Sequence, residues 1–473
     1  MSSLLQALDV SFTYPQDGHG LQAVSLSIEA GEAALVSGPS GCGKSTLARC
    51  LAGLIPHLYR GELGGEVRIS GENSADLALW QLAEQVGMVF QNPAAQMLAS
   101  TVEDEILFGL ENLGLPREEM TGRLQAALER FGLLEMRLRS PHTLSGGEQQ
   151  KLALAAITAR KPAALVLDEP LSMLDTTAAL EFVAHTQELR EQGTAVVYCE
   201  HRQEYVQALP GLKTIRLGKE PAHPQAVHQV PAWPGPADGP LALHVSGLNV
   251  PRGGRAVIRD LDLSLQGGKL IALVGRNGVG KTTLLRALSG LQPYTGSIQV
   301  QAGAAQLAPQ LGIVFQNPDL QLFNASVREE ILYRLEKPDH SLYQWVVEAL
   351  ELGRYLETPP LLLSEGEKRR VALATMLMRQ PRHGLLLDEP ALGQDEGHKA
   401  ILLRLLRAHA GAGHIVAFST HDLELAAQAD ELILLGPGGI TAQGPTAQVM
   451  RMEAAWQSLG FILPEWVRAK WCA

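Results

Sequence analysis

The chain has few cysteines and no long apolar run. Its four cysteines, Cys42, Cys50, Cys199 and Cys472, are widely scattered and match neither a disulfide framework nor a zinc-binding spacing. We therefore interpret them as thiols of a reducing compartment. No stretch of about eighteen apolar residues is present, which predicts no membrane-spanning helix. The first residues have neither the basic nor the apolar region of a signal peptide.

Positive charge is also scarce. The 39 Lys and Arg residues are outnumbered by 50 Asp and Glu residues, which gives a net charge of −11. A general nucleic-acid-binding protein needs a basic surface, so this class is disfavoured. ATP remains possible as a ligand, because a phosphate site needs only local positive charge. The 473 residues, 46% of them hydrophobic, predict a globular chain with more than one domain.

The sequence contains a long internal repeat. The phrase VFQNP occurs twice, and three longer motifs recur in the same order, 219 to 237 residues apart. A repeat this long predicts a duplicated domain, because solenoid units recur every ~20–50 residues. The longer motifs are GPSGCGKST (38–46) and GRNGVGKTT (275–283), LSGGEQQKLALA (144–155) and LSEGEKRRVALA (363–374), and ALVLDEP (164–170) and GLLLDEP (384–390).

A proline-rich segment separates the two copies. Dense proline prevents a helix or a central strand, so we expect an extended linker at 221–240 between domains at 1–220 and 241–473. Within each copy, short apolar runs that end in glycine or polar residues predict buried parallel strands, and the segment 100–160 is expected to be mostly helical. The predicted fold class is therefore α/β.

Both copies carry the pattern G-x-x-x-x-G-K-[ST] between an apolar strand and a helix. Glycines let consecutive backbone N–H groups point at an anion, and the helix N-terminus adds positive potential. The lysine supplies a full charge for the β- and γ-phosphates of ATP, and the following hydroxyl suits Mg²⁺. The predicted phosphate-binding residues are Gly38, Ser40, Gly41, Gly43, Lys44, Ser45 and Thr46, and Gly275, Asn277, Gly278, Gly280, Lys281, Thr282 and Thr283.

A pair of carboxylates ends one strand in each copy. Asp168 and Asp388 suit Mg²⁺, which prefers oxygen ligands, and the next residue, Glu169 or Glu389, is placed to take a proton from an attacking water. An isolated Asp-Glu pair is more often a helix cap or a surface ion pair. Its duplication downstream of a phosphate loop favours the catalytic interpretation.

Together these motifs resemble the nucleotide-binding domains of ABC ATPases over nearly the whole chain. LSGGE (144–148) is similar to the signature motif of that family, Gln91 and Gln316 to its Q-loop glutamine, and His201 and His421 to its switch histidine. A lone histidine is more often a core or surface residue, but each of these lies 33 residues after its DEP aspartate. The resemblance implies two P-loop NTPase domains of ABC ATPase type, each a RecA-like core with an antiparallel β subdomain and a helical signature subdomain.

The resemblance also implies a mechanism. The two domains of one chain would pair head to tail and enclose two ATP molecules, each between the phosphate loop of one domain and the signature of the other. The implied signature contacts to ATP are Ser145, Gly146, Gly147, Ser364 and Gly366. The implied Mg²⁺-binding residues are Ser45, Gln91, Asp168, Thr282, Gln316 and Asp388. The implied catalytic residues are Glu169, Glu389, His201 and His421.

The two copies differ at several of these positions. Tyr14 is placed where the family stacks an aromatic ring on adenine, whereas the second copy has Val250 there. Glu365 replaces a glycine in the second signature, where a carboxylate would repel the γ-phosphate unless it points outward. We therefore expect two active but unequal ATP sites.

The Q-loop segments indicate a narrower group. QNPxxQ followed by a TVEDE-like run resembles the ATPases of energy-coupling factor importers, which take up vitamins and transition-metal ions. The resemblance implies integral membrane partners, a transmembrane coupling component and a substrate-binding component, and a peripheral position on the cytoplasmic face of the membrane. Two alternatives stay open: a tandem ABC ATPase acting on ribosomes or DNA, and a tandem ATPase of a sugar or peptide importer. The tryptophan-rich C-terminal segment is expected to pack on its own domain or to contact a partner.

Overall fold

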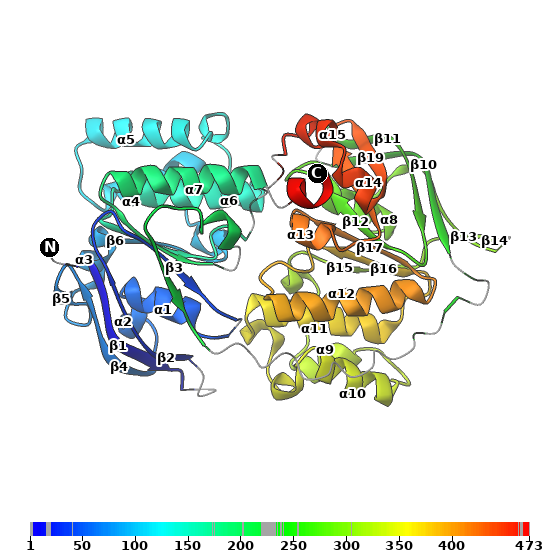
Figure 1. The fold of residues 1–473 in the computed structure, drawn as a ribbon, viewed down its shortest axis with the longest axis horizontal. Coiled ribbons are helices and arrows are strands. Elements are labelled where there is room, and N and C mark those ends of the chain that lie inside the picture. Colours follow the sequence, from blue (N-terminus) through cyan, green and yellow to red (C-terminus); the bar gives the residue numbers. More distant parts are fainter. Residues whose placement is uncertain are drawn as a thin grey trace. The chain divides into compact units, whose positions relative to one another are not determined.

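The computed structural model describes the chain except for residues 1–2, 16–19, 40, 173, 175, 201–202, 219–232, 234, 237–238, 240, 253–254, 304, 462, 464–466 and 473. Ser40, His201 and most of the predicted linker 221–240 therefore lie outside the described residues. The chain forms two compact units, unit 1 (Met1–Pro221) and unit 2 (Ala222–Ala473), and each is described separately below (Figure 1).

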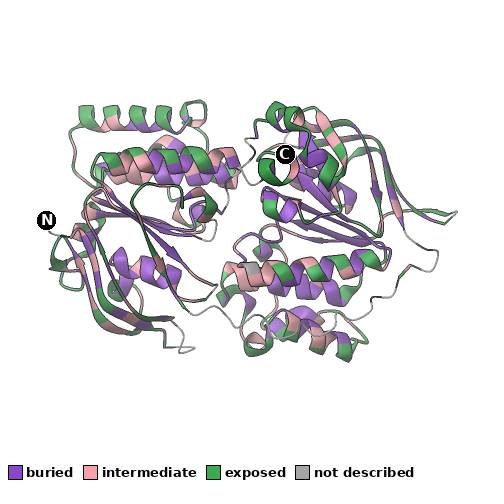
Figure 2. Cartoon of the chain, viewed as in Figure 1, coloured by how far each residue is buried: buried purple, intermediate pink, exposed green. Residues whose placement is uncertain are grey.

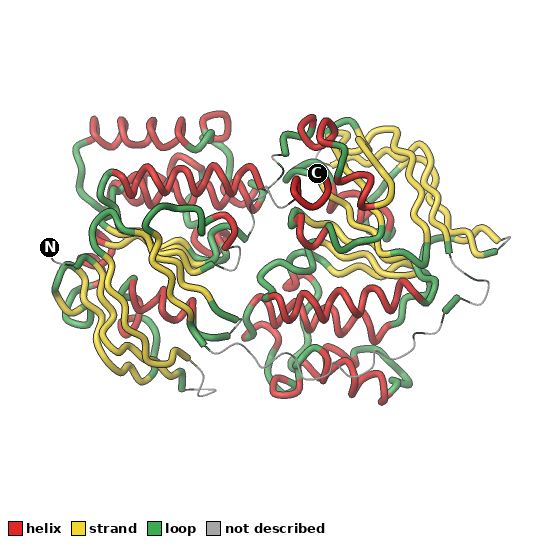
Figure 3. Tube along the Cα trace, in the orientation of Figure 1, coloured by secondary structure: helices red, strands yellow, loops and turns green. Residues whose placement is uncertain are grey.

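Unit 1 contains a parallel sheet, an antiparallel sheet and a group of helices (Figure 3). Its strands are β1 (Leu5–Thr13), β2 (Gly20–Ile28), β3 (Ala33–Ser37), β4 (Glu62–Ile69), β5 (Glu72–Asn73), β6 (Val86–Val89), β7 (Ala164–Asp168), β8 (Ala195–Cys199) and β9 (Leu212–Arg216). Its α-helices are α1 (Lys44–Leu51), α2 (Leu54–His57), α3 (Leu79–Gln85), α4 (Val102–Glu111), α5 (Arg117–Arg130), α6 (Gly146–Ala159) and α7 (Thr176–Glu191).

Unit 2 repeats this arrangement and extends it at the C-terminus. Its strands are β10 (Ala242–Arg252), β11 (Arg255–Gln266), β12 (Leu270–Val274), β13 (Thr295–Ala302), β14 (Ala305–Leu307), β15 (Leu311–Val314), β16 (Gly384–Asp388), β17 (Ile415–Thr420), β18 (Glu431–Gly436) and β19 (Gly439–Pro445). Its α-helices are α8 (Lys281–Leu288), α9 (Val327–Leu332), α10 (His340–Ala349), α11 (Glu365–Arg379), α12 (Glu396–Gly411), α13 (Leu423–Ala426), α14 (Thr446–Met450) and α15 (Glu453–Ser458).

The parallel sheets have the same central order. The order is β6-β7-β8-β3-β9 in unit 1 and β15-β16-β17-β12-β18-β19 in unit 2, where only β19 runs antiparallel to its neighbour. The strand before each glycine-rich loop and the strand that ends in Asp-Glu therefore flank the same neighbour, β8 or β17. Loops that follow these parallel strands meet at one edge of the sheet, which is where α/β sheets bind ligands.

Helices and the antiparallel sheet cover opposite faces of each parallel sheet. In unit 1, Ala33 and Leu35 of β3 pack with α4 to α7, whereas Ala34 and Val36 pack with α1 and the antiparallel sheet. Unit 2 has the same division, with α9 to α12 on one face of β12. Burial on both faces explains why these strands are continuous apolar runs in the sequence, and Figure 2 shows them buried along their length.

The antiparallel sheets have the orders β2-β1-β4-β5 and β11-β10-β13-β14. Thus each unit has the predicted α/β core, antiparallel β subdomain and helical subdomain, and the helical prediction for 100–160 is confirmed by α4, α5 and α6. Trp456 near the C-terminus is completely buried, and its indole N–H donates to the carbonyl of Val449 at 3.0 Å, so this part of the tail packs on its own unit.

Among the helices in the described part of the chain, none combines the length and the apolar composition that crossing a bilayer needs.

Candidate functional site

The two glycine-rich loops connect β3 to α1 and β12 to α8. The residue before each helix, Gly43 or Gly280, has a φ of 100° or 108°. Only glycine adopts this left-handed conformation without strain. It turns the chain so that the first N–H groups of the helix face the loop, and this arrangement favours an anion.

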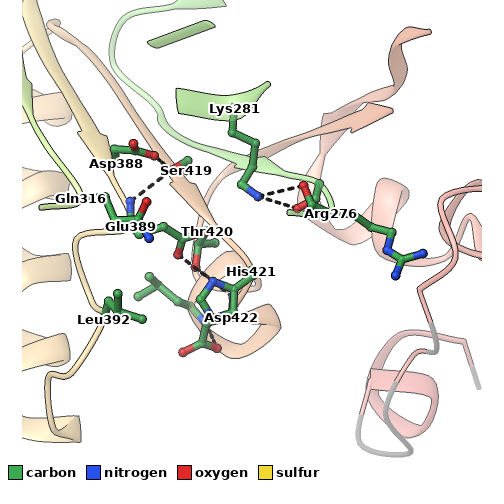
Figure 4. A network of polar contacts seen from close by, with 12 residues as sticks. Arg276, Lys281, Gln316, Asp388, Glu389, Leu392, Ser419, Thr420, His421 and Asp422 are labelled. Carbon is green, nitrogen blue, oxygen red and sulfur yellow. Dashed lines mark hydrogen bonds and ion pairs between the residues drawn. The ribbon is translucent and has the colours of Figure 1, made fainter. Parts of the chain in front are cut away.

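The lysine of each loop is buried and folds back over it. Lys44 Nζ donates to the carbonyl oxygens of Gly38 at 2.9 Å and Pro39 at 3.0 Å, and Lys281 Nζ donates to that of Gly275 at 2.6 Å (Figure 4). A buried ammonium group requires such acceptors. Phosphate oxygens accept stronger, charge-assisted hydrogen bonds than neutral carbonyls do. Both lysines can therefore bind a phosphate group in the loop.

The loop hydroxyl and the strand-end aspartate are in contact in both units. Ser45 Oγ donates to Asp168 Oδ1 at 3.0 Å, and Thr282 donates a hydrogen bond to Asp388. The sequence separates these partners by more than a hundred residues, but β3 and β7 both flank β8, as β12 and β16 flank β17. A hydroxyl and a carboxylate beside a phosphate loop are the oxygen donors that Mg²⁺ prefers.

The glutamate after each aspartate has a strained backbone. Glu169 and Glu389 have φ values of 48° and 49°, in the left-handed region that side chains other than glycine seldom adopt. Their N–H groups donate to the carbonyls of Cys199 at 2.8 Å and Ser419 at 3.2 Å on the neighbouring strand. Strain of this kind persists where the surroundings impose it, typically at functional sites.

Each glutamate has a side-chain partner among the described residues. Gln91 Nε2 donates to Glu169 Oε2 at 2.6 Å in unit 1. In unit 2, His421 Nδ1 lies 3.0 Å from Glu389 Oε2 (Figure 4). Burial would raise the pKa of Glu389, but the charge and hydrogen bond of His421 outweigh it, and the pKa is lowered. Glu389 is thus held as a carboxylate, the form that a general base requires.

Both strand-end aspartates have a raised pKa. Burial, and then the neighbouring charge of Glu169, raise the pKa of Asp168 to about 7 despite the hydrogen bond from Ser45. Burial also raises the pKa of Asp388, where hydrogen bonds from Ser419 and Thr282 oppose the shift. A cation bound at either carboxylate would favour its ionised form.

The serine of each signature motif begins a long helix. Ser145 caps α6 and Ser364 caps α11, each in a capping box with a glutamate three residues later. The following glycines, Gly146 and Gly147 or Gly366, lie in the first helical turn. The Glu365 carboxylate lies 3.8 Å from Lys368 Nζ on the same helix. Both helices therefore present the serine and a positive helix end, which suit an anionic ligand.

The segments after Gln91 and Gln316 are held by residues that sequence reasoning did not single out. Gln96 accepts from Phe90 N at 2.9 Å and donates to Met88 O at 3.1 Å, and Gln321 makes the same two contacts in unit 2. The buried Glu105 accepts from Leu98 N and Ala99 N, as Glu330 does from the equivalent pair. Gln96 belongs to the QNPxxQ pattern and Glu105 to the TVEDE-like pattern, so the recurrence of both patterns in the two copies could have indicated this role. They encode the support of this loop.

Three predicted residues need separate mention. Tyr14 accepts a hydrogen bond from Arg49 at 2.9 Å, and its hydroxyl lies 3.5 Å from that of Thr46, so its ring lies near the first phosphate loop. Val250 is completely buried in the antiparallel sheet and cannot contact a ligand there. His201 lies outside the described residues, so its contacts are not described.

Comparison with known proteins matches both units. Residues 21–172 and 258–392 each match the family described as ABC transporter. The chain is 35% identical to a Bacillus subtilis (strain 168) protein named YkoD, whose name assigns it provisionally to HMP/thiamine import as an ATP-binding protein. That match covers 95% of this chain and 93% of the relative.

Two further similarities span one or both units. A provisionally named ABC transporter ATP-binding protein of Streptomyces avermitilis is 34% identical and matches 93% of this chain and 94% of its own length. A solved structure described as cbiO1 from Clostridium perfringens, part of the ABC transporter complex cbiONQ, is 25% identical and covers 48% of this chain and 98% of its own, with a TM-score of 0.39.

Proposed function

Because the chain belongs to the ABC transporter family, as an ATPase with two ATP-binding domains in one polypeptide, we propose that it powers a membrane importer of the energy-coupling factor type. In this proposal it is peripheral to the cytoplasmic face of the membrane. Its partners are a transmembrane coupling component and a substrate-binding component.

An apolar groove in unit 1 is the observation that carries the proposal. It has a volume of about 560 Å³ and lies between α3, α4, α6 and the segment after Gln91. Trp80, Leu98 and Phe108 line it and are 65%, 74% and 51% exposed. Three large exposed apolar side chains around one groove are typical of a protein-binding surface. An amphipathic helix from a membrane subunit fits a groove of this composition.

The groove is linked to the catalytic glutamate through one short loop. Gln91 contacts Glu169 at 2.6 Å, and Leu98 lines the groove only seven residues later. Gln96 and Glu105 fix both ends of this loop by four hydrogen bonds to the backbone that flanks it. A helix that moves in the groove therefore shifts Gln91. A change at Glu169 is transmitted through Gln91 to the membrane partner in the same way.

ATP binding and hydrolysis supply the force. In the proposed cycle the two domains, 1–220 and 241–473, pair head to tail, and Lys44 and Lys281 each bind one ATP that is covered by Ser364 or Ser145 of the other domain. Glu169 and Glu389 accept the proton of the attacking water. Loss of the γ-phosphate removes its contacts with the signature helices and lets the pair open.

The residues present fit Mg²⁺. Ser45 with Asp168, and Thr282 with Asp388, place a hydroxyl and a carboxylate in direct contact beside each phosphate loop. Gln91, which contacts Glu169 beside Asp168, offers a further amide oxygen, and Gln316 is its counterpart in unit 2. When bound, Mg²⁺ would neutralise negative charge on the β- and γ-phosphates.

A vitamin, a vitamin precursor or a transition-metal ion is the proposed cargo class. The relative named for HMP/thiamine import supports the vitamin branch. No residue of an ATPase of this type contacts the cargo, because specificity belongs to the membrane-embedded substrate-binding component.

Copurification from mild detergent tests the proposal. We expect the tagged chain to retain integral membrane proteins and their bound small molecule, and Leu98→Glu to lose them because it places a charge in the groove. Leu138→Glu is the matched control, since Leu138 is 69% exposed and does not line the groove. Recovery of ribosomes or DNA instead of membrane proteins would contradict the importer assignment. Equal retention of membrane proteins by both variants would contradict the groove as the docking site.

A further inference from the structure

The hydroxyl of Ser419 lies between the two acidic residues of unit 2. Ser419, the residue before the end of β17, pairs with Asp388 of β16 and is completely buried. Its Oγ donates to Asp388 Oδ1 at 2.5 Å and accepts from the N–H of Glu389 at 3.1 Å (Figure 4). A serine hydroxyl offers one donor and two acceptor positions. The hydroxyl proton of Ser419 is donated to the carboxylate of Asp388. One lone pair of its oxygen accepts the N–H of Glu389, the residue with the strained backbone.

Unit 1 has a thiol at the equivalent position. Cys199 pairs with Asp168 in the same register and is also completely buried. A thiol is a weak donor and acceptor, and among the described residues the Cys199 side chain makes no hydrogen bond with Asp168. The N–H of Glu169 donates to the backbone carbonyl of Cys199 at 2.8 Å. The two units thus share the acidic residues but not the group that fixes them.

We propose that Ser419 is a positioning residue that fixes Asp388 for Mg²⁺ and Glu389 for the attacking water, and that Cys199 leaves unit 1 with a weaker metal site. Outer hydrogen-bond partners orient metal-binding carboxylates and raise their affinity. The bond to the N–H of Glu389 also stabilises a backbone conformation that would otherwise cost free energy. This inference rests on the ATPase activity and not on the importer role.

A purely structural role for Ser419 makes a different prediction. A buried hydroxyl must find partners wherever it lies, and removing it would then lower stability without changing metal affinity at fixed nucleotide occupancy. Metal binding, measured apart from nucleotide binding and stability, separates the two interpretations.

Mn²⁺ binding to the full chain is the test. In a Lys44→Ala background, nucleotide binding is left to the loop of Lys281. With saturating AMP-PNP, a non-hydrolysable ATP analogue, Mn²⁺ is titrated and followed by electron paramagnetic resonance. We expect Ser419→Ala and Ser419→Cys to weaken Mn²⁺ binding by about 10-fold, the lower end for loss of an outer partner. AMP-PNP affinity should stay close to that of the parent, and the loss of Mn²⁺ affinity should exceed what any fall in melting temperature accounts for.

The reciprocal substitution in unit 1 should change Mn²⁺ affinity in the opposite direction. In a Lys281→Ala background, Cys199→Ser supplies unit 1 with the hydroxyl and should tighten Mn²⁺ binding by about threefold or more. In hydrolysis assays, Ser419→Ala should raise the Mg²⁺ concentration for half-maximal ATPase activity more than it lowers kcat. Ser419→Thr, which keeps the hydroxyl, should restore the parental Mn²⁺ affinity.

Two results would overturn the proposal. The first is parental Mn²⁺ affinity in folded Ser419→Ala or Ser419→Cys. The second is a loss of Mn²⁺ binding that matches an equal loss of AMP-PNP binding and of melting temperature, which is the structural role. If Ser419→Ala does not fold, Ser419→Cys and Cys199→Ser decide, and unchanged Mn²⁺ affinity in both rejects the proposal.

Discussion

Among the described residues, the proposed catalytic glutamate of unit 1, Glu169, is hydrogen-bonded to Gln91, and that of unit 2, Glu389, is paired with His421. Gln91 is neutral and belongs to the loop beside the apolar groove. His421 carries a charge when protonated and lowers the pKa of Glu389. This carboxylate can therefore be held from the loop beside the groove, through Gln91, or from the end of β17, through His421.

The two signature helices, α6 and α11, also differ in their hydrogen bonds to neighbouring loops. Arg369 of α11 donates to the carbonyl of Gln316 at 3.1 Å and to that of Leu392, so it joins the helix to the loops after β15 and β16. Lys368 adds an ion pair to Asp319 at 2.8 Å. The residue of α6 equivalent to Arg369 is Gln150, which is completely buried and has no hydrogen-bond partner for its amide among the described residues.

An unsatisfied buried amide costs about 1–3 kcal/mol. Gln150 would gain a hydrogen bond if α6 moved toward a loop carbonyl. Arg369 already makes such hydrogen bonds in unit 2. We therefore expect the helical subdomain of unit 1 to be displaced more easily than that of unit 2, where Arg369 joins it to the core. Each prediction below changes one residue toward its counterpart in the other unit or removes a residue that both share.

Removal of the shared general base should have the largest effect. Glu169→Gln and Glu389→Gln should each lower kcat for ATP by about 100-fold or more, because a positioned base contributes at least that factor and the proposed pair opens only after hydrolysis. Steady-state ATPase assays measure this effect. Two independently working sites would instead leave about half of the activity in each single variant, and one nucleotide per chain in the double variant would contradict the enclosed pair.

The sequence was sufficient for the parts of the site that short motifs encode. Lys44, Ser45, Asp168 and Glu169 could be named because a phosphate loop and a strand-end carboxylate each need particular residues at fixed local spacing. The α/β core followed from apolar runs, since a strand buried on both faces has no polar positions.

The supporting contacts could not be predicted, because they depend on strand register and not on local pattern. Ser419 and Asp388 are 31 residues apart in sequence. They are in contact only because the register of β16 and β17 places them opposite each other. Arg369 was visible as a charge on a helix, but its partners are backbone carbonyls, which any residue supplies. The sequence therefore shows that the copies differ, but the effect of Ser419 and Arg369 on the supporting contacts appears only in the structure.

Replacement of Arg369 should have the next largest effect. Arg369→Gln copies unit 1 and removes charge-assisted bonds to two buried carbonyls, so it should cost about 2 kcal/mol of local stability. Amide hydrogen exchange in residues 316–321 and 391–394 should become roughly 30-fold faster. Arg379→Gln is the control on the same helix, because its one contact, to Tyr333 at 3.4 Å, is exposed and weak. Unchanged exchange in Arg369→Gln would refute the fixed subdomain.

Replacement of Tyr14 should have a smaller effect. Tyr14→Val copies Val250 and should weaken ATP binding at the loop of Lys44 by about 10-fold, the lower range for loss of one base–aromatic stack. Tyr14→Phe keeps the ring and loses only the hydrogen bond with Arg49, so it should bind ATP nearly as the parent does. Calorimetric titration in a Lys281→Ala background isolates this site. Equal losses in both variants would assign the effect to the hydroxyl.

The smallest effect at neutral pH concerns three buried histidines of unit 2. His409 stacks on His414 at 4.4 Å, packs edge-on against Trp233 and has no hydrogen-bond partner on either ring nitrogen among the described residues. His383 is buried in the same unit. Unit 1 has Leu189 in α7 where α12 has His409. His409→Leu should therefore stabilise unit 2 by about 1 kcal/mol at pH 7, because an unsatisfied polar group is removed.

The gain from His409→Leu should grow in acid. Burial, and then the charge of His414, lower the pKa of His409 from 6.5 to about 3 in the folded chain. The unfolded chain takes up the proton first, so the parent loses stability as the pH falls from 6.5 toward 3, by about 2 kcal/mol at pH 5. Urea unfolding at pH 8 and pH 5 measures this difference, with the exposed His340→Leu as control. Because His185 of unit 1 also has a lowered pKa, about 4, the variant should flatten the acid limb for unit 2 only. A parallel shift at both pH values would show that His409 is not the group that titrates.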